Sequence, residues 1–140
     1  MMLGDLMTIV QYKLPVKVIV FNNRSLGMVK LEMEVAGIPD LETDMLNPDF
    51  TKIAEAMGMT GITINEPDEV KPGLLKAFQQ EGPVLVNIWT DPNALAMPPK
   101  LELEQMKGYA LYMGRMMLRG RMDEVFNMIS SNYKHLTEVL

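Results

Sequence analysis

The sequence predicts an α/β domain with a parallel sheet, and three observations support this fold class. Segments of helical composition alternate with short apolar runs, as in proteins whose helices cover both faces of such a sheet. Three apolar runs have the length of strands, Val16–Phe21, Thr60–Ile64 and Pro83–Thr90. Finally, 140 residues suffice for one domain with a buried core.

Around the first strand, the sequence predicts two helices and a loop. The first helix covers Asp5–Tyr12 and ends at Leu14-Pro15, because a residue before proline disfavours helical dihedrals. The second begins at Ser25 and continues to about Val35, where the segment 36–39 stops it. Residues 40–47 are expected to form a polar loop.

Asp49 is predicted to cap a helix over Phe50–Met57, since its carboxylate accepts from free backbone N–H groups. Gly58 is placed to end that helix. After the second strand, a turn at 65–68 leads into a helix that ends near Gln80.

The last third of the chain is predicted to be helical. A connector covers Asp91–Lys100, and two helices follow at Leu101–Leu118 and Met122–Leu140, separated by residues 119–121. On the last helix, one apolar face is predicted from residues at helical spacing. This face contains Val125, Phe126, Ile129, Tyr133, Leu136 and Leu140.

Composition excludes several classes of protein. The net charge of −5 disfavours a general electrostatic grip on nucleic acid, which needs a surplus of Lys and Arg. The absence of cysteine removes disulfides, thiolate metal sites and a Cys nucleophile. No signal-peptide pattern opens the chain, and its apolar runs are far shorter than the ~20 residues that span a bilayer. We therefore expect a cytoplasmic protein.

The fifteen methionines are expected to be adaptable core residues, with a methionine-rich binding surface as the alternative.

The predicted domain is expected to be incomplete. A parallel sheet of three strands has two edges with unpaired backbone groups. The run Met1–Leu3 precedes a helix that has no earlier strand to place it on the sheet. We expect an N-terminal portion to be missing.

The pair Asn22-Asn23 follows the first strand, where α/β proteins generally bind ligands. A side-chain amide oxygen and a backbone carbonyl are hard, neutral ligands that suit Mg²⁺, together with a carboxylate, phosphate or water. The alternative is an amide pair that only caps the following helix.

The segment Val16–Val29 resembles the second half of the thiamine-diphosphate motif, which begins with Gly-Asp-Gly and ends with Asn-Asn. Residues 4–16 resemble the helix and strand entry between the two halves, so the Gly-Asp-Gly turn would precede Met1. Gly4-Asp5 is not that turn, because Leu6 replaces the second glycine.

The C-terminal part resembles quinone-linked pyruvate oxidases. The likeness lies in Pro98–Tyr109, Leu111–Met113 and Gly120–Val125. It implies a partial three-layer thiamine-diphosphate-binding fold with two C-terminal helices. Residues 1–97 would be the C-terminal half of that domain, and residues 98–140 its helical extension.

The resemblance assigns roles to residues around the amide pair. Asn23 would bind Mg²⁺ through its side chain and Ser25 through its backbone carbonyl, with the metal bridging the cofactor diphosphate. Leu26, Gly27 and Met28 would complete the cofactor-binding segment.

Three residues are implied to serve the reaction. Met28 matches a bulky position near the thiazolium and substrate. Val29 stands where decarboxylases carry a catalytic Glu, and an apolar residue there resembles oxidases. Glu32 matches an active-site acid of pyruvate oxidases and is the candidate for proton handling. Their spacing also fits two core residues and one solvated charge.

The resemblance implies part of a pyruvate oxidase that uses thiamine diphosphate, Mg²⁺ and FAD and passes electrons to quinone or oxygen. This chain would be inactive without the other portions of the enzyme or oligomer. An acetolactate synthase-like carboligase and a non-catalytic interaction module are the alternatives. The last helix is expected either to pack on the domain or to contact the inner face of the membrane peripherally.

Overall fold

The computed structural model describes residues 3–94 and 103–139, with side chains to Tyr133. By its internal contacts the chain divides into two units, Met1–Asn23 with Leu46–Thr90, and Arg24–Met45 with Asp91–Leu140. We call these the sheet unit and the helical unit. The predicted domain boundary at residues 97 and 98 lies outside the described residues and stays a prediction.

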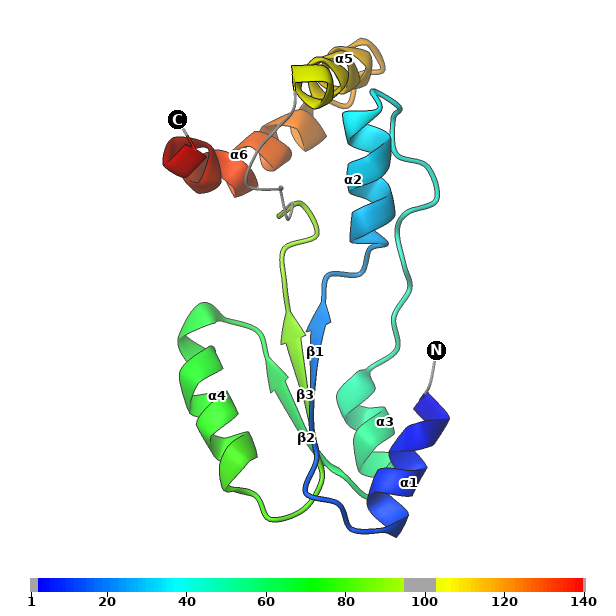
Figure 1. Cartoon of the computed structure of the whole chain (residues 1–140), viewed down its shortest axis with the longest axis vertical. Helices are drawn as coiled ribbons and strands as arrows, with labels where there is room; N and C mark the ends of the chain where they lie inside the picture. The colour runs from blue at the N-terminus through cyan, green and yellow to red at the C-terminus, as the bar shows by residue number, and fades with distance from the viewer. Residues whose placement is uncertain (1–2, 95–102, 140) are drawn as a thin grey trace. The chain divides into compact units, whose positions relative to one another are not determined.

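The sheet unit contains three parallel strands, β1 (Lys17–Asn22), β2 (Thr60–Ile64) and β3 (Val84–Trp89). Their spatial order is β1-β3-β2, with Val86 paired to Ile19 on one side and Ile62 on the other (Figure 1). The predicted α/β class and parallel sheet are confirmed. β3 is buried because it lies between two strands, whereas most residues of β1, a sheet edge in the described chain, are only half-buried.

Helices cover both faces of this sheet (Figure 1). On one face α4 (Pro67–Gln79) packs against alternate strand residues, including Ile64, Val84 and Val86. On the other face lie α3 (Phe50–Met57) and α1 (Leu6–Gln11), which follows the 3-10 turn Leu3–Asp5. The core of this second face contains Leu6, Ala54, Met59 and Leu85.

The ends of α3 match their sequence signals. The Asp49 side chain accepts from the backbone N–H of Lys52 at 3.1 Å. Gly58 follows the helix with φ +94°, a left-handed conformation that glycine adopts without steric cost. The predicted cap and stop are confirmed.

The helical unit contains α2 (Gly27–Val35), α5 (Leu103–Leu118) and α6 (Met122–Val139). α5 contacts both α2 and α6. Its core contains Tyr112, Met116, Val125 and Met128, with Leu31 packed against them. α2 begins two residues after the predicted start because Ser25 pairs with Asp44 in an antiparallel bridge instead.

In the part of the chain that the structure describes, no helix has the length and apolar character required to cross a membrane.

Candidate functional site

The site begins with Asn22, whose side-chain amide is held at both ends. Its Nδ2 donates to Oδ1 of Asn87 at 3.1 Å, and its Oδ1 accepts from Nδ2 of Asn47 at 2.8 Å. Its backbone oxygen accepts from the N–H of Thr90 at 3.2 Å. The hydrogen bonds of Asn22 are therefore made within the sheet unit. The one polar residue in the apolar run of β3, Asn87, is the only sign of these partners in the sequence.

Asn23 is the half-buried residue that follows β1. It stands at the carboxyl end of the parallel strands, as predicted from the sequence, and this end is the usual ligand-binding edge of an α/β sheet. The role of its side chain as a Mg²⁺ ligand stays a prediction.

Ser25 belongs to the helical unit, where the bridge to Asp44 fixes its backbone. The N–H of Leu26 donates to the oxygen of Thr43, and the N–H of Met45 donates to the oxygen of Arg24, both at 2.8 Å. Because these flanking residues make the bridge hydrogen bonds, the backbone carbonyl of Ser25 takes no part in the bridge. The use of this carbonyl as a Mg²⁺ ligand stays a prediction.

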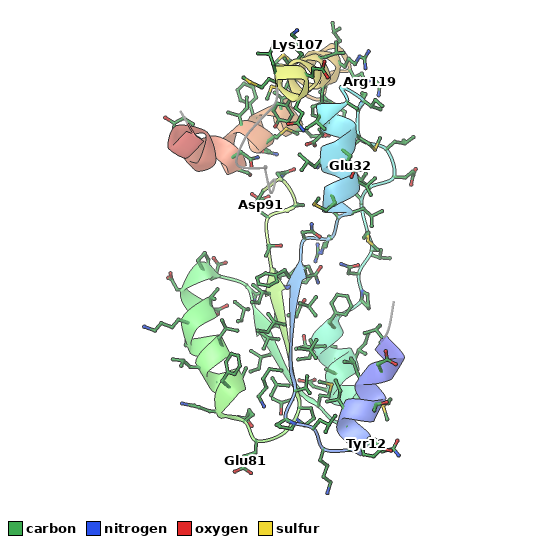
Figure 2. All side chains as sticks on the ribbon, viewed as in Figure 1. Tyr12, Glu32, Glu81, Asp91, Lys107 and Arg119 are labelled. Atoms are coloured by element: carbon green, nitrogen blue, oxygen red, sulfur yellow. The ribbon has the colours of Figure 1, made fainter. Side chains whose placement is uncertain are left out.

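The remaining site residues lie in the first turns of α2. Gly27 opens the helix, preceded by Leu26, which is exposed. Met28 is 66% exposed, Val29 is 46% exposed, and Glu32 is also exposed; Figure 2 labels Glu32 on this helix. The alternative of Met28 and Val29 as core residues is wrong within the described chain, because Leu31 and Glu34 occupy the buried side of α2.

Glu34 is a buried acid that sequence reasoning missed. It is fully buried, and neither carboxylate oxygen makes a hydrogen bond of normal geometry among the described residues. Burial raises the pKa of Glu34 to about 7, the charge of Lys30 limits this shift, and the charge of Asp40 adds to it. The Tyr112 hydroxyl is close enough to the carboxylate to lower this pKa slightly. Its spacing of three residues from the core residue Leu31 is the signal that could have placed it on the buried side.

No group of three His, Cys, Asp or Glu residues is arranged to hold a metal ion in the described ranges. The predicted ligands are of another kind, an amide oxygen and a backbone carbonyl. Such neutral oxygens suit Mg²⁺ only when an anionic ligand such as a diphosphate completes the coordination. The residues present therefore fit part of a Mg²⁺–diphosphate site.

The parallel sheet and the polar turn after β1 are typical of α/β domains that bind a ligand at the carboxyl ends of their strands. Residues 1–88 match the family described as "Thiamine pyrophosphate enzyme, C-terminal TPP binding domain". Because this match covers more than half of the chain, the chain belongs to that family. The predicted thiamine-diphosphate resemblance is confirmed at this level.

Similar proteins include one that is described only by its cofactor and several acetolactate synthases. YdaP of Bacillus subtilis, provisionally named a thiamine pyrophosphate-containing protein, is 36% identical over 81% of this chain and 20% of its own length. The acetolactate synthase large subunit of Pyropia yezoensis is 37% identical over 79% of this chain and 20% of its own. The large subunit of acetolactate synthase isozyme 3 of Escherichia coli is 42% identical over 57% of this chain and 14% of its own length. The chain spans about a fifth or less of the length of these relatives.

Proposed function

We propose that this chain supplies the Mg²⁺–diphosphate-binding part of a thiamine-diphosphate enzyme that acts on pyruvate. The family match and the Asn22-Asn23 turn at the carboxyl end of β1 support this proposal. Asn23 binds Mg²⁺ through its side-chain oxygen and Ser25 through its backbone carbonyl. Leu26, Gly27 and Met28 line the bound cofactor.

The bound cofactor supplies a carbanion and an electron sink for decarboxylation. The chain's own residues orient and shield it. Met28 and Val29 present apolar side chains from the exposed side of α2 and exclude water near the thiazolium. Glu32, one turn further along the same side, moves a proton at the substrate oxygen.

The reaction type we propose is that of a pyruvate oxidase, with FAD and a quinone or oxygen as acceptor in the whole enzyme. The resemblance of Lys100–Tyr109 to pyruvate oxidases favours it. The apolar Val29 fits both an oxidase and a carboligase, since neither needs a proton donor at that position. Acetolactate synthases among the relatives favour the alternative, a carboligase. Both types require further portions of the enzyme or an oligomer to complete the site.

Cofactor binding is tested by NMR titration of the ¹⁵N-labelled chain with thiamine diphosphate, with and without Mg²⁺. We expect shifts at the amides of Asn23, Ser25 and Gly27 only when both ligands are present. Because the anionic metal ligand is expected elsewhere, the dissociation constant should be on the order of 1 mM, or about −4 kcal/mol.

Asn23→Ala should abolish these shifts. Asn65→Ala is the matched control, because exposed Asn65 follows β2 at the same edge of the sheet. Unchanged shifts in Asn23→Ala would contradict the proposed metal ligand. Tight binding by the chain alone would contradict the claim that essential groups lie elsewhere.

Membrane contact through α6 is a second proposal. Phe126 and Tyr133 are 65% and 63% exposed, and Ile129 is also exposed, whereas Val125 packs in the core. The predicted face is therefore divided, with an exposed apolar part; the side chains of Leu136 and Leu140 lie outside the described residues. Replacing Phe126 and Ile129 by Ser should lower the partition coefficient into liposomes, measured by co-sedimentation, by about 100-fold or more, since each buried apolar side chain contributes about 1.5–3 kcal/mol. If the double variant Phe126→Ser/Ile129→Ser sedimented with liposomes as well as the wild type does, the proposed membrane contact would be contradicted.

A further inference from the structure

Three asparagines, Asn22, Asn47 and Asn87, form what we call the amide clamp, and all three lie in the sheet unit. Asn87 is level with Val20 in the strand register, and Asn22 is level with Trp89. Since alternate residues share a face, Asn22 and Asn87 lie on the side of the sheet that α1 and α3 cover. Each is only 2% exposed.

Three separate contacts fix Asn22, two from the amide clamp and one from the backbone of Thr90. Asn87 holds its side-chain nitrogen, Asn47 holds its side-chain oxygen, and Thr90 holds its backbone oxygen. Buried amides are costly unless paired, so the pairing restricts Asn22 to one rotamer and one backbone orientation. The peptide that leads from Asn22 into Asn23 is restricted with it.

We infer that Asn47 and Asn87 are positioning residues for the metal ligand Asn23 and act on it through Asn22. The metal part of this inference rests on the proposed function. Ligands of Mg²⁺ must meet a nearly ideal octahedron, so a loose Asn23 binds the metal more weakly than one fixed by the sheet.

The test measures two quantities in the whole chain. ¹⁵N relaxation gives the order of the Asn23 amide without ligand, and NMR titration gives the dissociation constant for thiamine diphosphate with Mg²⁺. Asn87→Val removes the acceptor for Asn22 Nδ2 and suits a β-strand. We expect a lower order parameter at Asn23 and a dissociation constant about fivefold larger, which corresponds to one hydrogen bond of about 1 kcal/mol.

Asn47→Ala provides an independent variant should Asn87→Val fail to fold, because Asn47 is only half-buried and lies in the loop before α3. It removes the donor to Asn22 Oδ1 and should change both quantities in the same direction. Asn87→Asp keeps an acceptor for Asn22 Nδ2, so we expect Asn23 to remain ordered in that variant.

Val86→Ala separates positioning from general destabilisation. Val86 is fully buried in β3 but faces α4, away from the clamp. This variant should unfold at lower denaturant concentration and leave the order of Asn23 and the dissociation constant unchanged.

The outcomes distinguish the clamp from the proposed function. An Asn23 amide that stays ordered in both Asn87→Val and Asn47→Ala would overturn the inference, as would an equal loss of order in Val86→Ala. If wild type gives no response to Mg²⁺ with thiamine diphosphate, the proposed function fails; loosening of Asn23 in Asn87→Val would then still support the clamp.

Discussion

Glu34 lies on α2, the helix that carries the candidate site residues, and makes the stability of this helix depend on pH. Its pKa is about 7 in the folded chain against a normal value of 4.5, because burial disfavours the charged form. The folded state therefore binds more protons than the unfolded state between these values. Stability from this group is fully present below about pH 4.5 and is lost as the pH rises through 7.

Hydrogen exchange of the α2 amides, corrected for intrinsic exchange rates, measures the free energy of opening of this helix at each pH. At about 1.4 kcal/mol per pH unit, the opening free energy of α2 should fall by about 3 kcal/mol between pH 4.5 and 8. Glu34→Gln removes the titration and should flatten this dependence. Glu32→Gln, an exposed neighbour on the same helix, should keep it; a flat profile in wild type would contradict the assignment to Glu34.

Among single residues, the sequence predicted those that act on their own neighbours along the chain. Asp49 and Gly58 act on backbone groups within one turn, so their positions along the chain suffice. The partners of Asn22 could not be predicted, because Asn47 and Asn87 meet it only after the sheet and the 40–47 loop have folded. The burial of Glu34 likewise depends on α5, which comes from a distant part of the sequence.

At the scale of elements, most boundaries follow from apolar spacing and turn residues. The prediction for β2 matches the observed strand, whereas α2 begins later than predicted because a bridge between Ser25 and Asp44 competes with its first turn. The sequence gives no sign of such a bridge, since its partner is a polar loop. The contact between α2 and α5 also escaped prediction, although a glycine within α5 marks it.

Gly108 allows α5 to approach the end of α2. A Cβ at this position would lie 1.8 Å from the backbone oxygen of Val35, a contact that real atoms do not make. Gly108→Ala should therefore lower the free energy of unfolding of the helical unit by about 1–3 kcal/mol, in the range of overpacking. Chemical denaturation followed by the exchange of α5 amides measures it.

Gly114→Ala is the matched control in the same helix. An added Cβ there meets nothing within 4 Å, so better helix propensity should stabilise α5 by up to about 1 kcal/mol. Destabilisation by both substitutions would indicate that helix propensity or the unfolded state, and not the approach to Val35, determines the effect.

At the scale of the whole molecule, the sequence predicted the family but left the reaction open. The family follows from a motif and from matches along the chain, whereas the relatives include both acetolactate synthases and a protein of broader description. The resemblance of Lys100–Tyr109 to pyruvate oxidases favours an oxidase, and the acetolactate synthases among the relatives favour a carboligase.

A chimera tests this choice. The 82 residues that match Escherichia coli acetolactate synthase isozyme 3 large subunit would replace their counterparts in that enzyme. For an oxidase-type site, the ratio of ferricyanide reduced to acetolactate formed from pyruvate should rise above that of the unaltered enzyme. Acetolactate formation with no increase in ferricyanide reduction would favour the carboligase.

The strand order β1-β3-β2 also bears on how the chain folds. β2, α4 and β3 are consecutive, so pairing of β2 with β3 closes a short loop. Pairing of β1 with β3 closes a much longer loop, because α2, α3, β2 and α4 lie between them in the sequence. Long-range pairing of this kind is slow, because loop-closure entropy is lost before the contacts compensate it. During synthesis, β1 would therefore leave the ribosome well before its neighbour, and Asn22 would meet Asn87 only in the last step of sheet assembly.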